Sequence, residues 1–325
     1  MTTPRMKVLY LPMTQLDPRW QQEVISAVGP HHDLRIYDPT APLEPQFADV
    51  DVVLDTGGTV GTRQMVDAAT RVRLWQILGT GLDHFDMDYW RSKGVPVANC
   101  PGPMSAIALA EHALMFILML YRGFPASQQT LQSGGFGNPL GRELPGQVLC
   151  VVGFGASAQE LAMRAHALGM RVIGTDLREI SPAEAMRWGA ERIVPPAELD
   201  SLLPEADVVS LHLHLTDETR HTLDARRIAL MKRGSFIVNV ARGALVDEGA
   251  MVAAITSGHV GGAGLDVFSE EPVPLDSPLL TTPGIIATPH VSGGTDGTAR
   301  RRAAGGAENI DRIARGLPPR YRVDQ

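Results

Sequence analysis

The sequence predicts an α/β protein built from two doubly wound parallel-sheet domains. The chain has 325 residues, which is more than a single hydrophobic core usually takes. Short runs rich in Val, Ile and Leu alternate with helix-like stretches, as in parallel sheets covered by helices on both faces. A segment rich in glycine and proline, residues 133–146, separates two such series.

The two series can be followed along the chain in order. Five strands are expected before residue 101, in the segments KVLYLP, DLRIYD, DVVLDT, LWQILG and VPVANC. A long apolar helix is predicted over residues 107–121. Seven further strands are expected in QVLCVVG, MRVIGTD, ERIV, DVVSLHL, SFIVNV, GGAGLDVF and GIIATPH. Many of these runs lack clean polar alternation, which is typical of strands buried on both faces. The tail from Ser292 indicates one more helix.

Charge, apolar segment length and cysteine number limit the expected partners and location of the protein. The formal net charge is −7 and no long Lys or Arg run is present, so we expect no nucleic acid partner. The N-terminal apolar run is short and is broken by Pro12, which argues against a signal peptide. The helix over 107–121 is shorter than the roughly 20 residues of a membrane span, so no membrane partner is expected. Two cysteines make no disulfide framework, which favours a cytoplasmic location.

The stretch VVGFGASA, residues 151–158, matches the G-x-G-x-x-G/A dinucleotide fingerprint in the version that ends in alanine. A predicted strand precedes it and an amphipathic helix follows, and the N-terminal amides of such a helix can hold a pyrophosphate. The cofactor-binding residues expected in this turn are Gly153, Gly155, Ala156 and Ser157. An ordinary glycine turn is the alternative interpretation.

The next predicted strand ends on Asp176, about 20 residues further on, where a carboxylate accepts hydrogen bonds from the adenosine ribose. A carboxylate at this position repels a 2′-phosphate, so NAD is favoured over NADP. Arg178 lies close enough to keep NADP open as a second cofactor.

Three later segments support a catalytic site. They are NVARGALVDE (239–248), AGLDVFSEEP (263–272) and ATPH (287–290). Each places a polar residue at or just beyond the C-terminal end of a predicted strand, where open parallel sheets bind ligands. The planar guanidinium of Arg242 suits a carboxylate. Glu271 and His290 can form a carboxylate-oriented imidazole that carries a proton near neutrality.

With LGTGLDHFD (78–86), NCPG (99–102), ALAEH (108–112) and DVVSLHLHLTDET (207–219), the sequence resembles the D-isomer-specific 2-hydroxyacid dehydrogenases over nearly its whole length. The resemblance is to members of the glyoxylate and hydroxypyruvate reductase type. It implies a Rossmann NAD-binding domain, residues 101–290, inserted in a flavodoxin-like substrate domain made of residues 1–100 and 291–325.

The resemblance also implies an activity, a hydride transfer between NAD(H) and a small D-2-hydroxy acid or 2-oxo acid such as glyoxylate or hydroxypyruvate. The family's catalytic residues fall on Arg242, Glu271 and His290. His290 is then the acid/base, Arg242 holds the substrate carboxylate and Glu271 orients His290. Glu270 is expected to face solvent. The substrate-binding residues implied are Thr80 and Gly81, through their backbone amides, with Arg242 and His290.

Further contacts follow from the same resemblance. The remaining cofactor-binding residues implied are His212, Val240, Ala241, Arg242, Asp266, His290 and Gly293. Among them, Asp266 is expected at the nicotinamide carboxamide and His212 near the adenosine. A homodimer is implied, with the apolar helix around residues 116–120 at its interface. No metal is expected, because the H-x-H pair His212 and His214 has no third ligand at a suitable spacing.

The chain departs from the family at Ala156 and Ser157, where relatives often carry Arg and Ile. We therefore expect the pyrophosphate cradle to use backbone amides alone and to bind NAD more weakly than in such relatives. Two other functions stay open on the sequence. Phosphite dehydrogenases share the Arg, Glu and His set, and NAD-sensing corepressor-like binding proteins retain similar residues.

Overall fold

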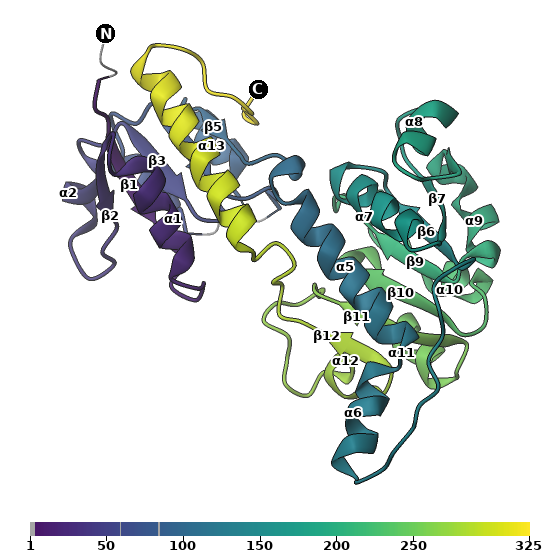
Figure 1. The fold of residues 1–325 in the computed structure, drawn as a ribbon. Helices are drawn as coiled ribbons and strands as arrows, with labels where there is room; N and C mark the ends of the chain where they lie inside the picture. Colours follow the sequence, from purple (N-terminus) through teal and green to yellow (C-terminus); the bar gives the residue numbers. More distant parts are fainter. Residues whose placement is uncertain (1–3, 59, 84) are drawn as a thin grey trace. The chain divides into compact units, whose positions relative to one another are not determined.

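The computed structural model describes residues 4–58, 60–83 and 85–325. The chain forms two compact units, Met1–Met104 with Gly294–Gln325 (unit 1) and Ser105–Gly293 (unit 2) (Figure 1). Each unit contains one sheet, and all named strand pairs in both sheets are parallel. The predicted fold class, two parallel-sheet α/β domains, is therefore confirmed.

Unit 1 has a five-stranded sheet in the order β2-β1-β3-β4-β5, which is the flavodoxin-like order. Its strands are β1 (Lys7–Leu11), β2 (Asp33–Ile36), β3 (Val52–Asp55), β4 (Leu74–Ile77) and β5 (Val97–Ala98). Its helices are α1 (Arg19–Val28), α2 (Leu43–Phe47), α3 (Arg63–Ala68), α4 (Met87–Ser92), η1 (Gly102–Met104) and α13 (Asp296–Ala314). All five strands fall in the segments that the sequence predicts.

Helices cover both faces of this sheet because successive strand residues point to opposite sides. Val8 and Tyr10 of β1 belong to the core that contains α1 and α13, whereas Leu9 and Leu11 belong to the core that contains α2, α3 and α4. A buried polar contact also ties α13 to β4, since Asn309 Nδ2 donates to Gln76 Oε1 at 2.6 Å. The C-terminal helix is thus an integral part of unit 1.

Unit 2 has a seven-stranded sheet in the order β12-β11-β10-β9-β6-β7-β8, the Rossmann order with one added strand. Its strands are β6 (Val148–Val152), β7 (Arg171–Thr175), β8 (Arg192–Val194), β9 (Val208–Leu211), β10 (Ser235–Asn239), β11 (Val260–Leu265) and β12 (Ile285–Ala287). Its helices are α5 (Ala106–Tyr121), α6 (Phe124–Gln132), α7 (Ala156–Ala167), α8 (Pro182–Arg187), η2 (Pro196–Glu198), α9 (Leu199–Leu202), η3 (Leu203–Glu205), α10 (Ala225–Leu230), η4 (Gly243–Leu245), α11 (Glu248–Thr256) and α12 (Pro278–Thr281).

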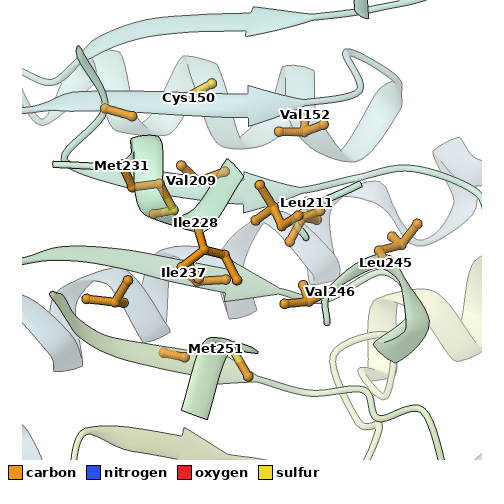
Figure 2. Packing of buried hydrophobic residues seen from close by; sticks show 14 of the residues in the cluster. Cys150, Val152, Val209, Leu211, Ile228, Met231, Ile237, Leu245, Val246 and Met251 are labelled. Atoms are coloured by element: carbon orange, nitrogen blue, oxygen red, sulfur yellow. The ribbon is translucent and has the colours of Figure 1, made fainter. Parts of the chain in front are cut away.

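The sheet of unit 2 is also buried on both faces. Leu149 and Val151 of β6 pack in the core with α5 and α7. The alternate residues Cys150 and Val152 pack in the opposite core, a cluster that extends across the sheet to Met251 of α11 (Figure 2). All five residues of β6 are buried, which explains why the sequence shows no polar alternation there.

Helix α5 packs closely on β11 because the strand is rich in glycine. A Cβ at Gly264 would lie 2.5 Å from Cβ of Phe116. Most of the apolar segment 116–120 is part of this core, since Phe116 and Ile117 are fully buried and Leu120 is 8% exposed. The segment expected at a dimer interface therefore packs mainly inside its own unit. The exposed apolar residues of α5 are Ile107, Met115 and Leu118.

Within the described residues, no single helix is long and apolar enough to cross a membrane. Helices α5 and α6 reach that length and composition only as a pair, and they are bent by 55°. The same residues contain no group of three or more His, Cys, Asp or Glu side chains that could hold a metal ion.

Candidate active site

Glu271 and His290 form a direct hydrogen-bonded pair in unit 2, with 2.7 Å between Glu271 Oε2 and His290 Nδ1. The other carboxylate oxygen, Oε1, accepts from the backbone N–H of Phe268 at 2.9 Å. Burial raises the pKa of Glu271, but the hydrogen bonds from His290 and Phe268 and the charges of His290 and Arg242 outweigh it and lower the pKa below its ordinary value. Glu271 is therefore ionised near neutral pH, and the proton of the pair lies on Nδ1.

The backbone of His290 is held in an unusual conformation. Its φ of 55° lies in the left-handed region, which costs free energy for a residue with a side chain. The N–H of His290 donates to the carbonyl of Asp266 at 2.7 Å. This contact ties the turn after β12 to the end of β11, where the segment leading to Glu271 begins.

The Asp266 carboxylate holds the same turn and is fully buried. It accepts from Thr288 Oγ1 and from the backbone N–H groups of Val291 and Ser292, at 2.5, 2.8 and 2.7 Å. The structure thus shows Asp266 positioning the segment that carries His290. Its expected contact with nicotinamide stays a prediction.

His112 on α5 also contacts this turn, and the sequence did not predict that contact. Its Nε2 lies 2.9 Å from Thr288 Oγ1. Because Thr288 gives its proton to Asp266, His112 must donate to Thr288. Burial lowers the pKa of His112 while the charge of Asp266 opposes that shift, and the net direction is downward. The signal in the sequence was a histidine, next to Glu111, within a helix whose other residues are apolar.

Arg242 follows β10 on a turn that Asn239 fixes. The buried Asn239 side chain donates to the carbonyl of Arg242 at 2.7 Å and accepts from the N–H of Ala241 at 3.1 Å. The next residue, Gly243, allows this turn to touch the segment before Glu271, because a Cβ at Gly243 would lie only 1.9 Å from the carbonyl carbon of Phe268. The charge of Arg242 also lowers the pKa of Glu271. The structure therefore brings Arg242, Glu271 and His290 together.

Three residues implied as cofactor contacts lie beside these in the sequence, and their contact with a cofactor stays a prediction. Val240 and Ala241 are buried at the end of β10, and Gly293 is half-buried beyond Ser292. Glu270 is exposed, as expected. It also lines a separate cavity of about 290 Å³, whose other walls include Glu248 and Asp276.

The fingerprint turn between β6 and α7 fits a dinucleotide. Gly153 has a φ of 90°, and a Cβ there would lie 2.9 Å from the carbonyl oxygen of His212. Gly155 is the N-cap of α7, and no side chain caps that helix. A Cβ at Gly155 would have no described heavy atom within 4 Å, so there is free space beside the start of α7. Such an uncapped N-terminus suits a pyrophosphate.

Asp176 lies at the end of β7 and is linked to this turn. Its carboxylate accepts from the N–H of Phe154 at 2.7 Å and from the N–H and Nε of Arg178 at 2.8 and 3.1 Å. Burial raises the pKa of Asp176, but the hydrogen bonds from Arg178 and Phe154 outweigh it and lower the pKa. Asp176 is thus an anion at neutral pH, with a guanidinium beside it.

The side chain of Ser157 is engaged in a way that the sequence did not reveal. Its Oγ lies 2.9 Å from Nδ1 of His212, and Nε2 of His212 lies 3.0 Å from Oγ of Ser210. Strand β9 ends at Leu211, so His212 and His214 lie beyond the strand. His214 is exposed.

Thr80 and Gly81 lie in unit 1, on the loop after β4. Asn99 Nδ2 donates to the carbonyl of Thr80 at 3.0 Å. The hydroxyl Oγ1 of Thr80 is buried and has no hydrogen-bond partner among the described residues. A buried polar atom without a partner is costly and often marks a site that a ligand or water completes.

Comparison with known proteins places this site in a family. The model of the D-isomer specific 2-hydroxyacid dehydrogenase NAD binding domain matches residues 114–292. The hydroxypyruvate reductase of Thermotoga maritima is 37% identical over 274 residues, which cover 83% of this chain and 85% of that protein. The (S)-sulfolactate dehydrogenase of Chromohalobacter salexigens is 36% identical over 282 residues, 86% of this chain and 90% of that protein.

Solved structures agree with this result. The D-lactate dehydrogenase of Aquifex aeolicus, complexed with NAD and lactic acid, matches with a TM-score of 0.78 and 28% identity over 95% of this chain and 96% of that one. The chain therefore belongs to the D-isomer specific 2-hydroxyacid dehydrogenase family, and its Rossmann unit contains the family's NAD-binding domain. The chain spans about half the length of the D-3-phosphoglycerate dehydrogenases that it also matches.

Proposed function

We propose that the protein is an NAD-dependent oxidoreductase that interconverts a small 2-oxo acid and its D-2-hydroxy acid, with His290 as the acid/base. The observation that carries the proposal is the 2.7 Å contact between Glu271 and His290 Nδ1. The glutamate uses one oxygen on the Phe268 amide and the other on the imidazole, which fixes the ring and stabilises its cation. The names of relatives, hydroxypyruvate reductase above all, favour a substrate of the glyoxylate or hydroxypyruvate type.

Each residue has a separate task in this proposal. Because Glu271 occupies Nδ1, His290 delivers its proton from Nε2 to the substrate oxygen. Arg242 binds the substrate carboxylate and polarises the carbonyl, for which its planar, permanently charged fork is suited. A bound NADH would supply the hydride for the new C–H bond at C2. His290 supplies the proton that completes the hydroxyl, and its neutral imidazole then regains a proton from solvent.

We assign substrate binding to unit 1, through the backbone amides of Thr80 and Gly81. The loop is fixed by Asn99, and the partnerless hydroxyl of Thr80 supports a ligand-binding role.

The decisive test is a panel of glyoxylate, hydroxypyruvate and pyruvate with NADH and NADPH, and of phosphite with NAD and NADP. His290→Asn is the informative variant, because Asn tolerates the left-handed backbone better than Ala does. We expect turnover to fall about 10²- to 10⁴-fold while NADH still binds. The matched control is His214→Asn at an exposed histidine, which should leave turnover unchanged.

Two outcomes would redirect the proposal. Turnover with phosphite alone would make the protein a phosphite dehydrogenase. Silence with every substrate, together with tight NADH binding, would favour the NAD-sensing corepressor-like alternative. Normal turnover of His290→Asn would remove His290 from the mechanism.

Cofactor choice has its own test at Asp176. The ionised carboxylate beside the fingerprint turn favours a ribose 2′-hydroxyl over a 2′-phosphate. Asp176→Ala should narrow the preference for NADH over NADPH, measured as the ratio of dissociation constants. An unchanged ratio would show that Arg178 or another group sets the preference.

We further propose a cytoplasmic homodimer. The apolar residues that α5 exposes, Ile107, Met115 and Leu118, are 38%, 37% and 40% exposed and would be buried in such a dimer. Light scattering during size-exclusion chromatography should give twice the 35.0 kDa chain mass. A mass of one chain would exclude the dimer.

A further inference from the structure

Three side chains form a hydrogen-bonded chain at the dinucleotide turn. Ser210, at the end of β9, is fully buried, and its Oγ lies 3.0 Å from His212 Nε2. His212 Nδ1 in turn lies 2.9 Å from Oγ of Ser157, the second residue of α7. The chain therefore runs from the interior of the sheet to the first turn of the helix that follows the fingerprint glycines.

His212 is neutral at the pH at which the protein would work. Burial lowers the pKa of His212 to about 4. A neutral imidazole carries one N–H and one acceptor nitrogen. The hydrogen bonds from Ser210 through His212 to Ser157 can therefore run in either of two directions. In one direction, Nε2–H donates to Ser210 and Ser157 gives its proton to Nδ1. In the other, Ser210 gives its proton to Nε2, and Nδ1–H donates to Ser157.

The burial of Ser210 selects between these two directions. In the described part of the chain, its Oγ has His212 Nε2 as hydrogen-bond partner. If His212 donated to Ser210, the hydroxyl proton of this fully buried residue would need another acceptor, and leaving it without one costs free energy. If Ser210 donates to His212, the hydroxyl of Ser210 and both ring nitrogens of His212 are satisfied. Ser157 then receives a hydrogen bond on its oxygen and keeps its own O–H for a ligand.

The ligand that this O–H would meet follows from its place. Ser157 lies in the first turn of α7, two residues after Gly155, the uncapped N-cap with free space beside it. The carbonyl of His212 also contacts the turn, since a Cβ at Gly153 would lie 2.9 Å from it. An uncapped helix N-terminus attracts an anion, and in a dinucleotide the anion is the pyrophosphate.

We propose that Ser210, His212 and Ser157 form a directional relay that makes Ser157 a hydrogen-bond donor to the pyrophosphate of the dinucleotide. Ser157 is then the binding residue, and His212 and Ser210 are positioning residues that set the direction of its hydroxyl. The cradle therefore uses a side chain as well as backbone amides. The proposal needs the dinucleotide site but not the choice of a 2-oxo acid substrate.

The first test measures binding by calorimetry with NADH, ADP and adenosine. Ser157→Ala should weaken binding of NADH and ADP about 10-fold, the usual size for one hydrogen bond to a charged group, and should leave adenosine unchanged. Ser157→Thr keeps the hydroxyl and should bind like the wild type. Ser201→Ala, at an exposed serine of the same unit, is the matched control and should have no effect.

The second test separates the relay from simple packing. His212→Asn places an amide N–H near the position of Nδ1 and should retain ADP binding within about 3-fold. His212→Leu lacks that donor and should lose as much ADP affinity as Ser157→Ala. The double variant Ser157→Ala, His212→Leu should be no weaker than either single variant, because all three break the same contact.

The third test reads the direction of the relay in the unmodified protein. Long-range ¹H–¹⁵N spectra distinguish the two tautomers of a neutral imidazole, and we expect the proton of His212 on Nδ1 in the ADP complex. An Nε2–H tautomer in that complex, wild-type ADP affinity in Ser157→Ala, or no binding of NADH or ADP at all would overturn the proposal. Loss of the 2-oxo acid activity alone, with this binding pattern intact, would count against the proposed reaction and leave the relay supported.

Discussion

Gly243 lies where the turn that carries Arg242 contacts the segment before Glu271. It therefore tests how the proposed catalytic cluster of Arg242, Glu271 and His290 is held together. A Cβ at this position would lie 1.9 Å from the carbonyl carbon of Phe268, 2.2 Å from the backbone nitrogen of Ser269 and 2.4 Å from Cα of Phe268. All three atoms belong to the backbone, so no side-chain rotation can relieve the clash. Ordinary van der Waals contact begins at 3.4 Å, and the two segments would have to separate by about 1.5 Å.

The separation should affect both stability and activity. Overpacking a rigid contact costs about 1–3 kcal/mol, and each kcal/mol lowers the Tm of a domain of 150–250 residues by about 2–4 °C. One segment carries Arg242 and the other leads to Glu271. A displacement of about 1 Å can reduce catalysis about 100-fold, so kcat/KM for 2-oxo acid reduction should fall at least that much in Gly243→Ala.

The matched control is Gly249→Ala, in the first turn of α11. A Cβ at Gly249 has Asp247 Oδ1 as its nearest atom, at 3.5 Å, and alanine favours a helix over glycine by about 1 kcal/mol. Its Tm should therefore be unchanged or higher, and its kcat/KM should be unchanged. Thermal unfolding gives the Tm of both variants, and steady-state kinetics gives their kcat/KM. If Gly243→Ala behaves like Gly249→Ala in both measurements, the backbone contact does not hold the catalytic cluster.

Three further predictions follow from single contacts. Gly155→Ala adds a methyl group to open space at a φ of −76°, so the Tm should not change. The methyl group would occupy the proposed pyrophosphate site, so NADH titration should show at least about 10-fold weaker binding. Asp266→Asn turns one acceptor into a donor facing backbone N–H groups, which should cost about 1–3 kcal/mol in unfolding experiments. Burial raises the pKa of Asp55 in unit 1 from its ordinary 3.8 to about 6, so the folded state binds a proton that the unfolded chain releases. The contribution of Asp55 to stability therefore falls as the pH rises from about 4 to 6, and Asp55→Asn should remove this slope from a series of Tm values against pH.

The fold could be predicted from the sequence because its signals are local. Strands such as β6 and β9 are short apolar runs bounded by turn residues, and burial on both faces leaves no other arrangement for them than a covered parallel sheet. Even the two-residue strand β5 lies in a predicted segment. Its length could not be predicted, because it depends on pairing with β4 on one side and on contacts with the C-terminal residues Arg322 and Val323.

The parts of the site that escaped prediction depend on contacts between distant residues. His112 and Thr288 lie 176 positions apart, and no local pattern connects them. The same holds for Ser157 and His212, which are 55 positions apart. The segment DVVSLHLHL predicts a strand, but the strand ends one residue before His212, and the imidazole turns toward Ser157. In both cases the sequence showed a polar side chain in an unusual place, His112 in a mainly apolar helix and His212 just after a strand. It did not show which residue that side chain would contact.

Two carboxylates contact the segment around His290, and their hydrogen bonds give them different tasks. Asp266 is fully buried and accepts three donors, all from the turn itself, so it fixes the backbone on which His290 sits. Glu271 is partly exposed and has one oxygen on a backbone amide and the other on the imidazole, so it fixes the ring and its charge. Glu271→Gln should therefore reduce turnover about 100-fold or more with little change in Tm, since the backbone of the turn keeps its anchor. Asp266→Asn should lower both the turnover and the Tm. If Glu271→Gln lowered the Tm as much as Asp266→Asn does, the glutamate would be a structural anchor as well, and the division of tasks between the two carboxylates would be wrong.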